Sequence, residues 1–365
     1  MDGFRAQGWN ATDLVLPQDG GFTLVQTSGR IERGEFKLIL SVQEMGLFGG
    51  PGVDAIMAKG GVRRLYWALD YPYSCWTSVA GLAASSIVSY PTAGHLGCAR
   101  QHLRGDVTLL TLAHAAKRRE PLPWQDRTIE ALFVGNAPAA DPESMRASWA
   151  TRYPQPWSGV LEEMAERFDP LRTDALDALA REAVEARGYD STRIDRNNFM
   201  VLIATFDQYA WTRTRFAYLD AMRDLPITLV GRGWEPFAGG AAKILGPMPT
   251  EQSRALMAQS KLVLNLQPRW FRSHERVFEG MAAGCAVATT GPGTIANAIG
   301  AESDPADETA VVCLGPPAEA AAHLRALLGD EPRLRALADA GLAEQRARHT
   351  WAHRVGALLR ALDAA

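Results

Sequence analysis

The chain has 365 residues, a formal net charge of −3 and 47% hydrophobic residues, a composition typical of a globular protein with room for two domains. Neither half is basic enough to predict a nucleic-acid-binding surface, and no apolar run approaches the roughly 18 residues of a membrane span. The N-terminus lacks the apolar core of a signal peptide, and the four cysteines form no CxxC pair, so free thiols in a cytoplasmic protein are expected.

The first 120 residues alternate short apolar runs with polar loops, which predicts an α/β domain. The strand candidates are residues 22–27, 36–42, 62–69, 85–90 and 107–112. Several are followed at once by polar residues, among them Asp70, His95 and His114. Ligands bind beyond the carboxyl ends of parallel strands, so these three side chains are candidates for a catalytic base. Ordinary turn chemistry is the alternative explanation.

Residues 117–127 are rich in charge and proline and predict a linker between domains. A strand at 128–135 follows, and residues 139–187 then show helical spacing with a charged, solvated face. A further helix is predicted at about 197–222. We interpret residues 139–222 as a helical insertion within a second α/β domain.

The remainder of the chain again alternates strands and helices. The predicted strands are 226–230, 243–245, 261–267, 285–290 and 310–314, and the predicted helices are 251–259, 273–283, 316–328 and 331–363, the last with a break near Thr350. The helix at 273–283 has Ser273 as its expected N-cap and Gly284 as its stop. With its flanking strands it forms a β-α-β unit, whose strands should be parallel.

The first turn of that helix carries His274 and Arg276. Cations there oppose the partial positive charge of a helix N-terminus by about 0.3–1 kcal/mol each. A bound phosphate would reverse that penalty, whereas Glu275 and solvent could simply screen the two cations. Glu279, one turn further on, would accept hydrogen bonds from sugar hydroxyls, or it is an ordinary surface glutamate.

Several common motifs are absent from the sequence: HExxH, GxSxG, the GxxxxGK[ST] phosphate loop and DxD. Residues 291–296 fit G-x-G-x-x-A, but neither a long helix nor an acid about 20 residues later follows, so we interpret them as a turn. Gly231, Arg232 and Gly233 end a predicted strand and could let the backbone or the arginine approach a ligand. The same spacing is also common in ordinary turns.

Taken together, SHERVFEGMAAG, GRGW, ALFVGN and HTWAHRVGALLRAL resemble the CgeB-like (spore-maturation-protein-like) glycosyltransferases of the GT-B fold. The resemblance covers residues 36–365. It implies two Rossmann-like, doubly wound domains that face a cleft, with a C-terminal helix crossing back to the N-terminal domain. The implied domains are an acceptor-side domain at 1–120, shortened at its start, a nucleotide-sugar domain at 121–348, and the crossover helix at 349–365.

The resemblance also implies roles for individual residues. Backbone amides of Ser273, His274 and Glu275 would hold a diphosphate together with Arg276, and Glu279 would bind the ribose. The nucleotide base would lie along Leu245, Gly246, Pro247 and Met248. Better-known relatives carry E-x7-E, whose first glutamate falls at Phe271 here, so Arg272 or an N-domain residue would contact the sugar instead.

The expected activity is hexosyl transfer from a nucleoside-diphosphate sugar to a glycan, protein or small-molecule acceptor, retaining and without metal or cofactor. Arg276 would stabilise the leaving diphosphate, and Asp70, His95 or His114 would supply a base if one is needed. Two alternatives remain open at this point: a sugar-nucleotide epimerase or hydrolase on the same fold, and a catalytically silent sugar-nucleotide-binding protein.

Overall fold

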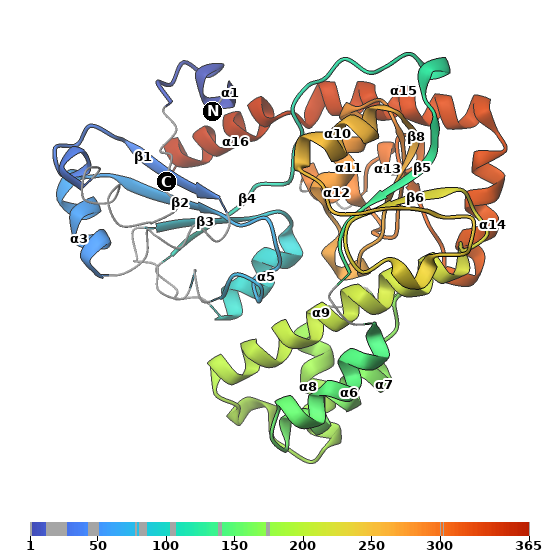
Figure 1. Ribbon diagram of the computed structural model, residues 1–365. Coiled ribbons are helices and arrows are strands. Elements are labelled where there is room, and N and C mark those ends of the chain that lie inside the picture. The colour runs from blue at the N-terminus through green and yellow to red at the C-terminus, as the bar shows by residue number, and fades with distance from the viewer. Residues whose placement is uncertain are drawn as a thin grey trace. The chain divides into compact units, whose positions relative to one another are not determined.

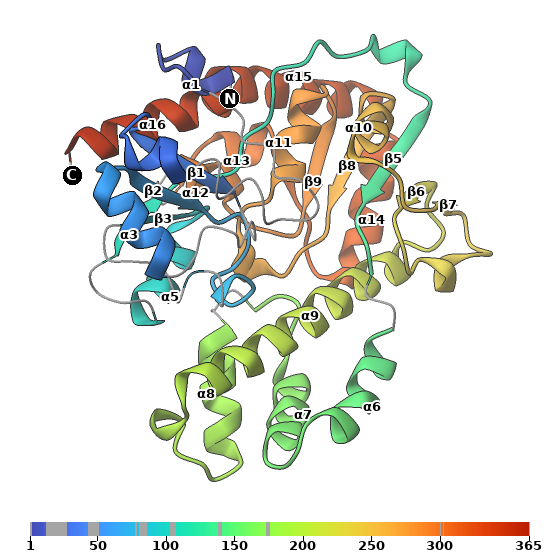
Figure 2. The ribbon, with the colours of Figure 1, turned by 60° about the vertical axis from the view of Figure 1, so that its left-hand side comes forward.

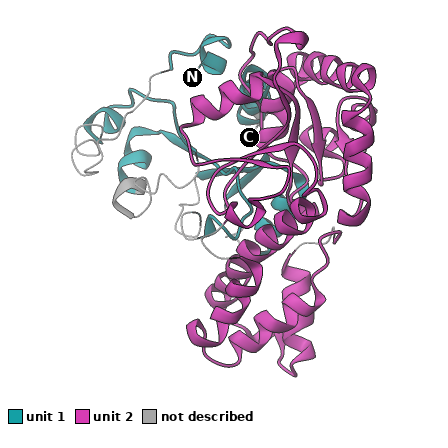
Figure 3. Ribbon diagram, turned by 45° about the vertical axis from the view of Figure 1, so that its right-hand side comes forward, with its two compact units in different colours: residues 1–113, 351–365 teal, residues 114–350 magenta. Residues whose placement is uncertain are grey.

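The computed structural model describes residues 2–11, 28–42, 51–76, 79, 86–102, 107–137, 141–172, 176–299, 301 and 303–364. The chain forms two compact units, shown in different colours in Figure 3. Unit 1 comprises residues 1–113 and 351–365, and unit 2 comprises residues 114–350. The chain therefore leaves the first unit once and returns to it with its last segment.

Unit 1 is built on a parallel sheet of four strands in the order β1-β2-β3-β4. The strands are β1 (Leu38–Val42), β2 (Arg63–Trp67), β3 (Ser86–Tyr90) and β4 (Thr108–Thr111), and the helices are α1 (Asp2–Arg5), α3 (Pro51–Gly60), α5 (Ala93–His102) and α16 (Trp351–Ala364). These four strands confirm the sequence prediction to within two residues. The strand predicted at 22–27 lies outside the described residues.

The last helix, α16, belongs to unit 1, where it lies beside α1 (Figure 1). Val355, Leu358 and Leu362 pack with the apolar side chains of β2 and β3. The Trp351 ring meets Trp67 edge-on at 5.5 Å. Burial of this apolar stripe holds the returning helix on the first sheet, as the fold prediction requires.

Unit 2 contains a parallel sheet of six strands in the order β10-β9-β8-β5-β6-β7. The strands are β5 (Ile129–Val134), β6 (Ile227–Val230), β7 (Lys243–Leu245), β8 (Ser260–Asn265), β9 (Ala286–Thr289) and β10 (Val312–Cys313). From β5 the chain builds the sheet in one direction, and from β8 it builds in the other. The order therefore reverses between β5 and β8, and ligands of such sheets bind beyond the carboxyl ends of the strands at that switch point.

The helices of unit 2 cover this sheet and extend beyond it. They are α10 (Thr250–Ala258), α11 (Glu275–Ala282), α12 (Thr294–Ile299), α13 (Ala306–Thr309), α14 (Pro317–Leu328) and α15 (Glu331–Arg348), with short 3-10 turns η2 (Trp124–Asp126), η4 (Glu235–Phe237) and η5 (Arg269–Phe271). The helix predicted at 331–363 is interrupted at residues 349–350, as expected. Among the described residues, no helix is both long and apolar enough to cross a membrane.

A separate group of helices projects from this sheet domain. They are α6 (Pro142–Arg152), α7 (Trp157–Arg167), α8 (Leu176–Ala186) and α9 (Arg196–Ala221), with η3 (Ser191–Arg193) before α9. Figures 1 and 2 show α6, α7 and α8 beside the N-terminal half of α9, while its C-terminal half reaches the sheet. Tyr218 and Leu219 of α9 enter the core beside Leu229 of β6. One long helix thus connects the helical group to the sheet.

The β8-α11-β9 unit forms as predicted, with both strands parallel in the sheet. Val277, Phe278 and Met281 of α11 have no exposed surface. Gly284 ends the helix with φ of 70°, a conformation that favours glycine. The prediction of Ser273 as N-cap is wrong, because the helix begins one residue later and His274 occupies that position.

Candidate functional site

His274 caps α11 through its ring. Its Nδ1 accepts a hydrogen bond from the Arg276 amide at 3.1 Å, so this nitrogen carries no proton. Burial, followed by the charge of Arg276, lowers the pKa of His274 well below its usual value. The ring is therefore neutral at neutral pH and satisfies a helix amide. This corrects the expectation of a cation opposing the helix dipole.

Ser273 has a different role from the predicted one. Its buried hydroxyl shares a hydrogen bond of 3.0 Å with Nδ1 of His114, whose ring stacks at 6.0 Å from His274. Its amide donates to the Phe271 carbonyl at 2.6 Å. The Ser273 amide is therefore already used within the chain. This corrects the expectation that it would hold a diphosphate together with the amides of His274 and Glu275. His114, one of the three candidate bases, therefore lies beside the N-terminus of α11.

Arg276 lies where the sequence suggests, but its side chain points into the protein. The guanidinium donates to Oδ1 of Asn265 at 3.2 Å and lies 5.4 Å from the centre of the Phe133 ring. The residue is only 8% exposed, and burial lowers its pKa to about 10. Within the described part of the chain it forms no ion pair with a carboxylate.

A second arginine, which the sequence analysis did not identify, lies next to Arg276. Arg215 of α9 donates to the Asn136 carbonyl at 2.6 Å and to the Leu266 carbonyl at 3.4 Å. Its guanidinium covers the Trp211 ring at 4.5 Å and also lies near Phe133, at 5.8 Å. Burial, followed by the charge of Arg276, lowers its pKa to about 9. No ion pair links it to a carboxylate among the described side chains.

The two arginines meet at the switch point of the sheet. Asn136 follows β5, while Asn265 ends β8 and Leu266 comes directly after it, so both guanidinium groups are fixed at the carboxyl ends of these neighbouring strands. Arg276 is buried and Arg215 is half-buried, and neither forms an ion pair with a carboxylate among the described residues. Two like charges placed this way are costly unless an anion neutralises them. Guanidinium groups bind phosphate oxygens with paired hydrogen bonds, and a helix N-terminus adds to that attraction. We call Arg215 and Arg276 the cationic cluster of the α11 N-terminus.

Glu279 lies on α11, one turn after Glu275. Its Oε1 accepts hydrogen bonds from Nε and Nη2 of Arg254 at 2.8 and 2.7 Å. The carboxylate is 17% exposed. Arg254 therefore fixes the orientation of this side chain, and the remaining carboxylate oxygen is not used in these two bonds. Arg272, in the loop between η5 and α11, is half-buried and has φ of 52°, in the left-handed region.

The remaining predicted contacts also follow strands of this sheet. A side chain at Gly231 (φ 132°) would place its Cβ 2.0 Å from the Gly135 carbonyl oxygen, so the tight approach of β6 to β5 requires glycine. The Arg232 amide donates to Oδ1 of Asn136 at 3.0 Å, while its side chain is exposed. Gly233 is half-buried. The segment from Leu245 to Met248, with Gly246 and Pro247 exposed, begins at the end of β7.

Asp70 and His95 belong to unit 1, whereas the cationic cluster is built entirely within unit 2. Asp70 is half-buried beyond β2. His95 has no exposed surface: its ring centre lies 4.5 Å from that of Tyr71, with the rings tilted by 52°, and its Nδ1 shares a hydrogen bond of 2.5 Å with the Thr92 hydroxyl. The His95 ring is thus placed as a core side chain, without access to an acceptor in solution.

Residues 291–293 of the G-x-G-x-x-A segment form a turn, as interpreted, whereas residues 294–296 begin the six-residue helix α12. The carboxylate of Asp307 accepts hydrogen bonds from the amides of Ile295 and Ala296 at 2.7 and 2.9 Å. The protein's own carboxylate thus occupies the position at which a dinucleotide phosphate would bind.

Comparison with known proteins agrees with this architecture. Residues 213–360 match a family described as glycosyl transferase-like. Anabaena HepE, in complex with UDP and glucose, is 12% identical, with 94% of this chain and 82% of that chain covered and a TM-score of 0.50, and its complex with UDP-glucose gives the same values. Sucrose-phosphate synthase from Thermosynechococcus elongatus is 14% identical over 96% and 81% of the two chains, with a TM-score of 0.49.

No curated protein sequence matches the chain significantly. The structural likeness establishes the fold, and the family match falls on the segment that carries Arg215, α10, α11 and Glu279. The chain has the GT-B fold, with two Rossmann-like parallel-sheet domains, and its residues 213–360 match a family described as glycosyl transferase-like.

Proposed function

We propose that the chain is a glycosyltransferase that moves a sugar from a nucleoside-diphosphate sugar to an acceptor hydroxyl. The observation that carries this proposal is the pair of arginines, half-buried Arg215 and buried Arg276, at the switch point of the sheet. Both arginines lie in the segment that matches the glycosyl transferase-like family. Neither has an acidic partner among the described residues, which favours an external anion as their counter-charge.

In the proposed reaction the bond between the anomeric carbon and the diphosphate oxygen breaks, and the acceptor oxygen bonds to that carbon. Negative charge develops on the leaving diphosphate, where Arg215, Arg276 and the N-terminus of α11 would stabilise it. These fixed charges would serve in place of a divalent cation, so we propose metal-independent transfer without a cofactor. Glu279, held by Arg254, would accept hydrogen bonds from the ribose hydroxyls.

The acceptor proton would pass to Asp70, to His114 or to the departing diphosphate itself. The last route needs no protein base and suits the retaining, hexosyl-transferring chemistry that we propose. We also propose that the chain is a CgeB-like enzyme, that it is cytoplasmic, and that Leu245–Met248 contact the nucleotide base.

The first experiment is a thermal-shift screen with UDP, GDP, ADP, CMP and dTDP. HepE binds UDP, so UDP is the first candidate for this chain. We expect one nucleoside diphosphate to raise the melting temperature in the presence of EDTA, since the cluster itself provides the positive charge. Failure of every diphosphate to shift the melting temperature would contradict the proposed site.

The second experiment separates transfer from the two alternatives. Release of nucleoside diphosphate is measured from the matching sugar nucleotide, with and without a panel of glycan acceptors. Release that requires an acceptor supports transfer, whereas release without one indicates a hydrolase. Acceptor-free conversion of the sugar indicates an epimerase, and binding without turnover indicates a silent binding protein.

A further inference from the structure

The helical group contains a pocket of about 500 Å³ that lies apart from the cationic cluster. It is bounded by the start of α7, the end of α8 and the segment that leads into α9. Its lining comprises Pro156, Trp157, Val160, Val184, Gly188, Tyr189, Asp190, Arg193, Ile194 and Asp195. This volume lies within the range that accommodates a small-molecule ligand.

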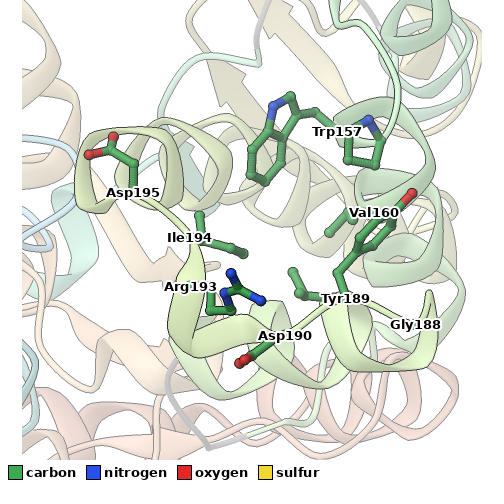
Figure 4. A pocket seen from close by; sticks show the side chains of 10 residues that line it. Trp157, Val160, Gly188, Tyr189, Asp190, Arg193, Ile194 and Asp195 are labelled. Atoms are coloured by element: carbon green, nitrogen blue, oxygen red, sulfur yellow. The ribbon is translucent and has the colours of Figure 1, made fainter.

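The pocket combines an apolar floor with aromatic walls. Val160 and Val184 are both 1% exposed and form the floor, whereas Tyr189 is 49% exposed at the rim. Figure 4 shows Trp157 and Tyr189 on adjoining sides of the opening, with Ile194 across from Tyr189. A large aromatic side chain left half in solvent offers a flat surface to a ligand that is itself partly apolar.

Two charged side chains of opposite sign lie at the rim: Arg193, which can donate hydrogen bonds, and Asp190, which can accept them. Arg193 makes no ion pair or side-chain hydrogen bond with another described residue, and Figure 4 shows its guanidinium directed toward the centre of the opening. Asp190 lies opposite Trp157 and uses Oδ1 for Thr192, which leaves its second oxygen outside these bonds. Asp195 faces away and caps α9.

This balance selects the chemistry of the ligand. An anion would meet Asp190 and a cation would meet Arg193, whereas a neutral polyhydroxylated molecule can donate to the first and accept from the second. The C–H faces of a sugar ring would pack on Trp157 and Tyr189. We infer that this pocket is a binding site for neutral glycans. The proposed donor site does not depend on it.

The position of the pocket indicates what it would do, on the condition that the proposed transferase function holds. Asp195 begins α9 and Arg215 lies 20 residues further along the same helix, which corresponds to about 30 Å at 1.5 Å per residue. A single sugar cannot occupy both places. The pocket would therefore retain an extended, polymeric acceptor at a distance from the sugar-transfer site.

The test uses saturation-transfer NMR of the full chain with four neutral probes: maltohexaose, cellohexaose, laminarihexaose and chitohexaose. We expect at least one to bind, and Tyr189→Ala and Arg193→Ala each to weaken its binding about tenfold or more. Both residues are exposed, so these variants should fold. Val201→Ala is the matched control, since Val201 is 57% exposed on α9 but does not line the pocket.

UDP titration of the same samples separates this inference from the proposed function. We expect UDP to bind equally to the wild type, Tyr189→Ala and Arg193→Ala. If the wild type binds none of the nucleoside diphosphates of the thermal-shift screen, the proposed donor site is overturned but the glycan pocket is not. The pocket inference is overturned if none of the four oligosaccharides binds, or if the bound one has equal affinity for the wild type and both variants.

Discussion

The N-termini of α11 and α12 lie after adjacent strands of one sheet, yet their electrostatics are opposite. At α12 the carboxylate of Asp307 accepts from two helix amides, so the local positive charge is already neutralised by the protein. At α11 the cap is a neutral histidine, and two arginines, buried Arg276 and half-buried Arg215, converge nearby. Both helices follow a strand of the same sheet. They differ in whether the chain itself supplies the negative charge that balances the positive charge at the helix N-terminus.

This difference explains why a glycine-rich motif can mislead. The G-x-G-x-x-A pattern marks α12, where an acid from the following segment closes the position. The α11 turn has no such motif, and its anion-binding character comes from side chains on α9 and α11. Mutation of the counter-charge at α12 should therefore lower the stability of the protein, whereas mutation of the arginines at α11 should lower its affinity for the ligand.

The largest effect is expected for Arg276→Met. Loss of a charge-assisted contact worth roughly 2–3 kcal/mol should weaken UDP binding by about 30- to 150-fold, measured by calorimetry. Because a buried cation without an acidic partner is removed, the ligand-free protein should be equally or more stable. Arg223→Ala, which removes an exposed cation paired with Asp220, is the control. Unchanged UDP affinity in Arg276→Met would exclude this residue from the site.

Arg215→Met should weaken UDP binding by about tenfold or somewhat more, by the same argument. The effect on affinity is smaller because Nε and Nη1 of Arg215 already donate to the carbonyls of Leu266 and Asn136, which leaves fewer N–H groups for a phosphate. The variant also leaves these two carbonyls without their donors, so some loss of stability is expected. Calorimetry with UDP, combined with thermal unfolding, distinguishes loss of ligand contact from loss of fold. A drop in stability with no change in affinity would make Arg215 structural only.

Asp307→Ala should act on α12 alone. Loss of the acceptor for the Ile295 and Ala296 amides should cost about 1–2 kcal/mol of unfolding free energy, as for other N-terminal caps. Chemical denaturation checks this cost. UDP affinity should stay within about twofold of the wild type. A large loss of affinity here would show that the α12 turn also takes part in binding.

The smallest effect concerns pH. The unfolded chain protonates His274 near its usual pKa of 6.5, whereas the folded chain does so only well below that value. The unfolded state therefore binds more protons as the pH falls below 6.5, and stability decreases by up to about 1.4 kcal/mol per pH unit until the folded pKa is reached. At pH 5.5 the cumulative loss should be about 1 kcal/mol.

His274→Asn tests this assignment, because asparagine can cap α11 without titrating in this range. Denaturation between pH 5 and 7.5 should show a flatter stability profile for this variant than for the wild type. Equal slopes in the wild type and His274→Asn would assign the pH dependence to other groups.

Much of the fold could be predicted because each element carries local signals. The buried strands are short apolar runs, and Gly284 marks the end of α11 as expected. The N-cap prediction missed by one residue, since Ser273 is the better cap by propensity but instead bonds to His114, 159 residues away. Such a contact depends on the tertiary structure and leaves no local pattern.

Arg215 was missed for a related reason. The run WTRTRF resembles a charged, solvated helix face, and Arg213 is indeed exposed. Arg215, however, lies four residues after Trp211 and three before Tyr218, on the apolar stripe of α9. An arginine on such a stripe is a signal for a buried cation, although its proximity to Arg276 follows only from the path of α9 across the sheet.

A crystal structure of the chain with UDP would test the central claim most directly. The account predicts phosphate oxygens within hydrogen-bonding distance of the Arg215 and Arg276 guanidinium groups, with the Asp307 carboxylate still on the α12 amides. A diphosphate bound at the α12 turn, or one bound without contact to either arginine, would contradict it.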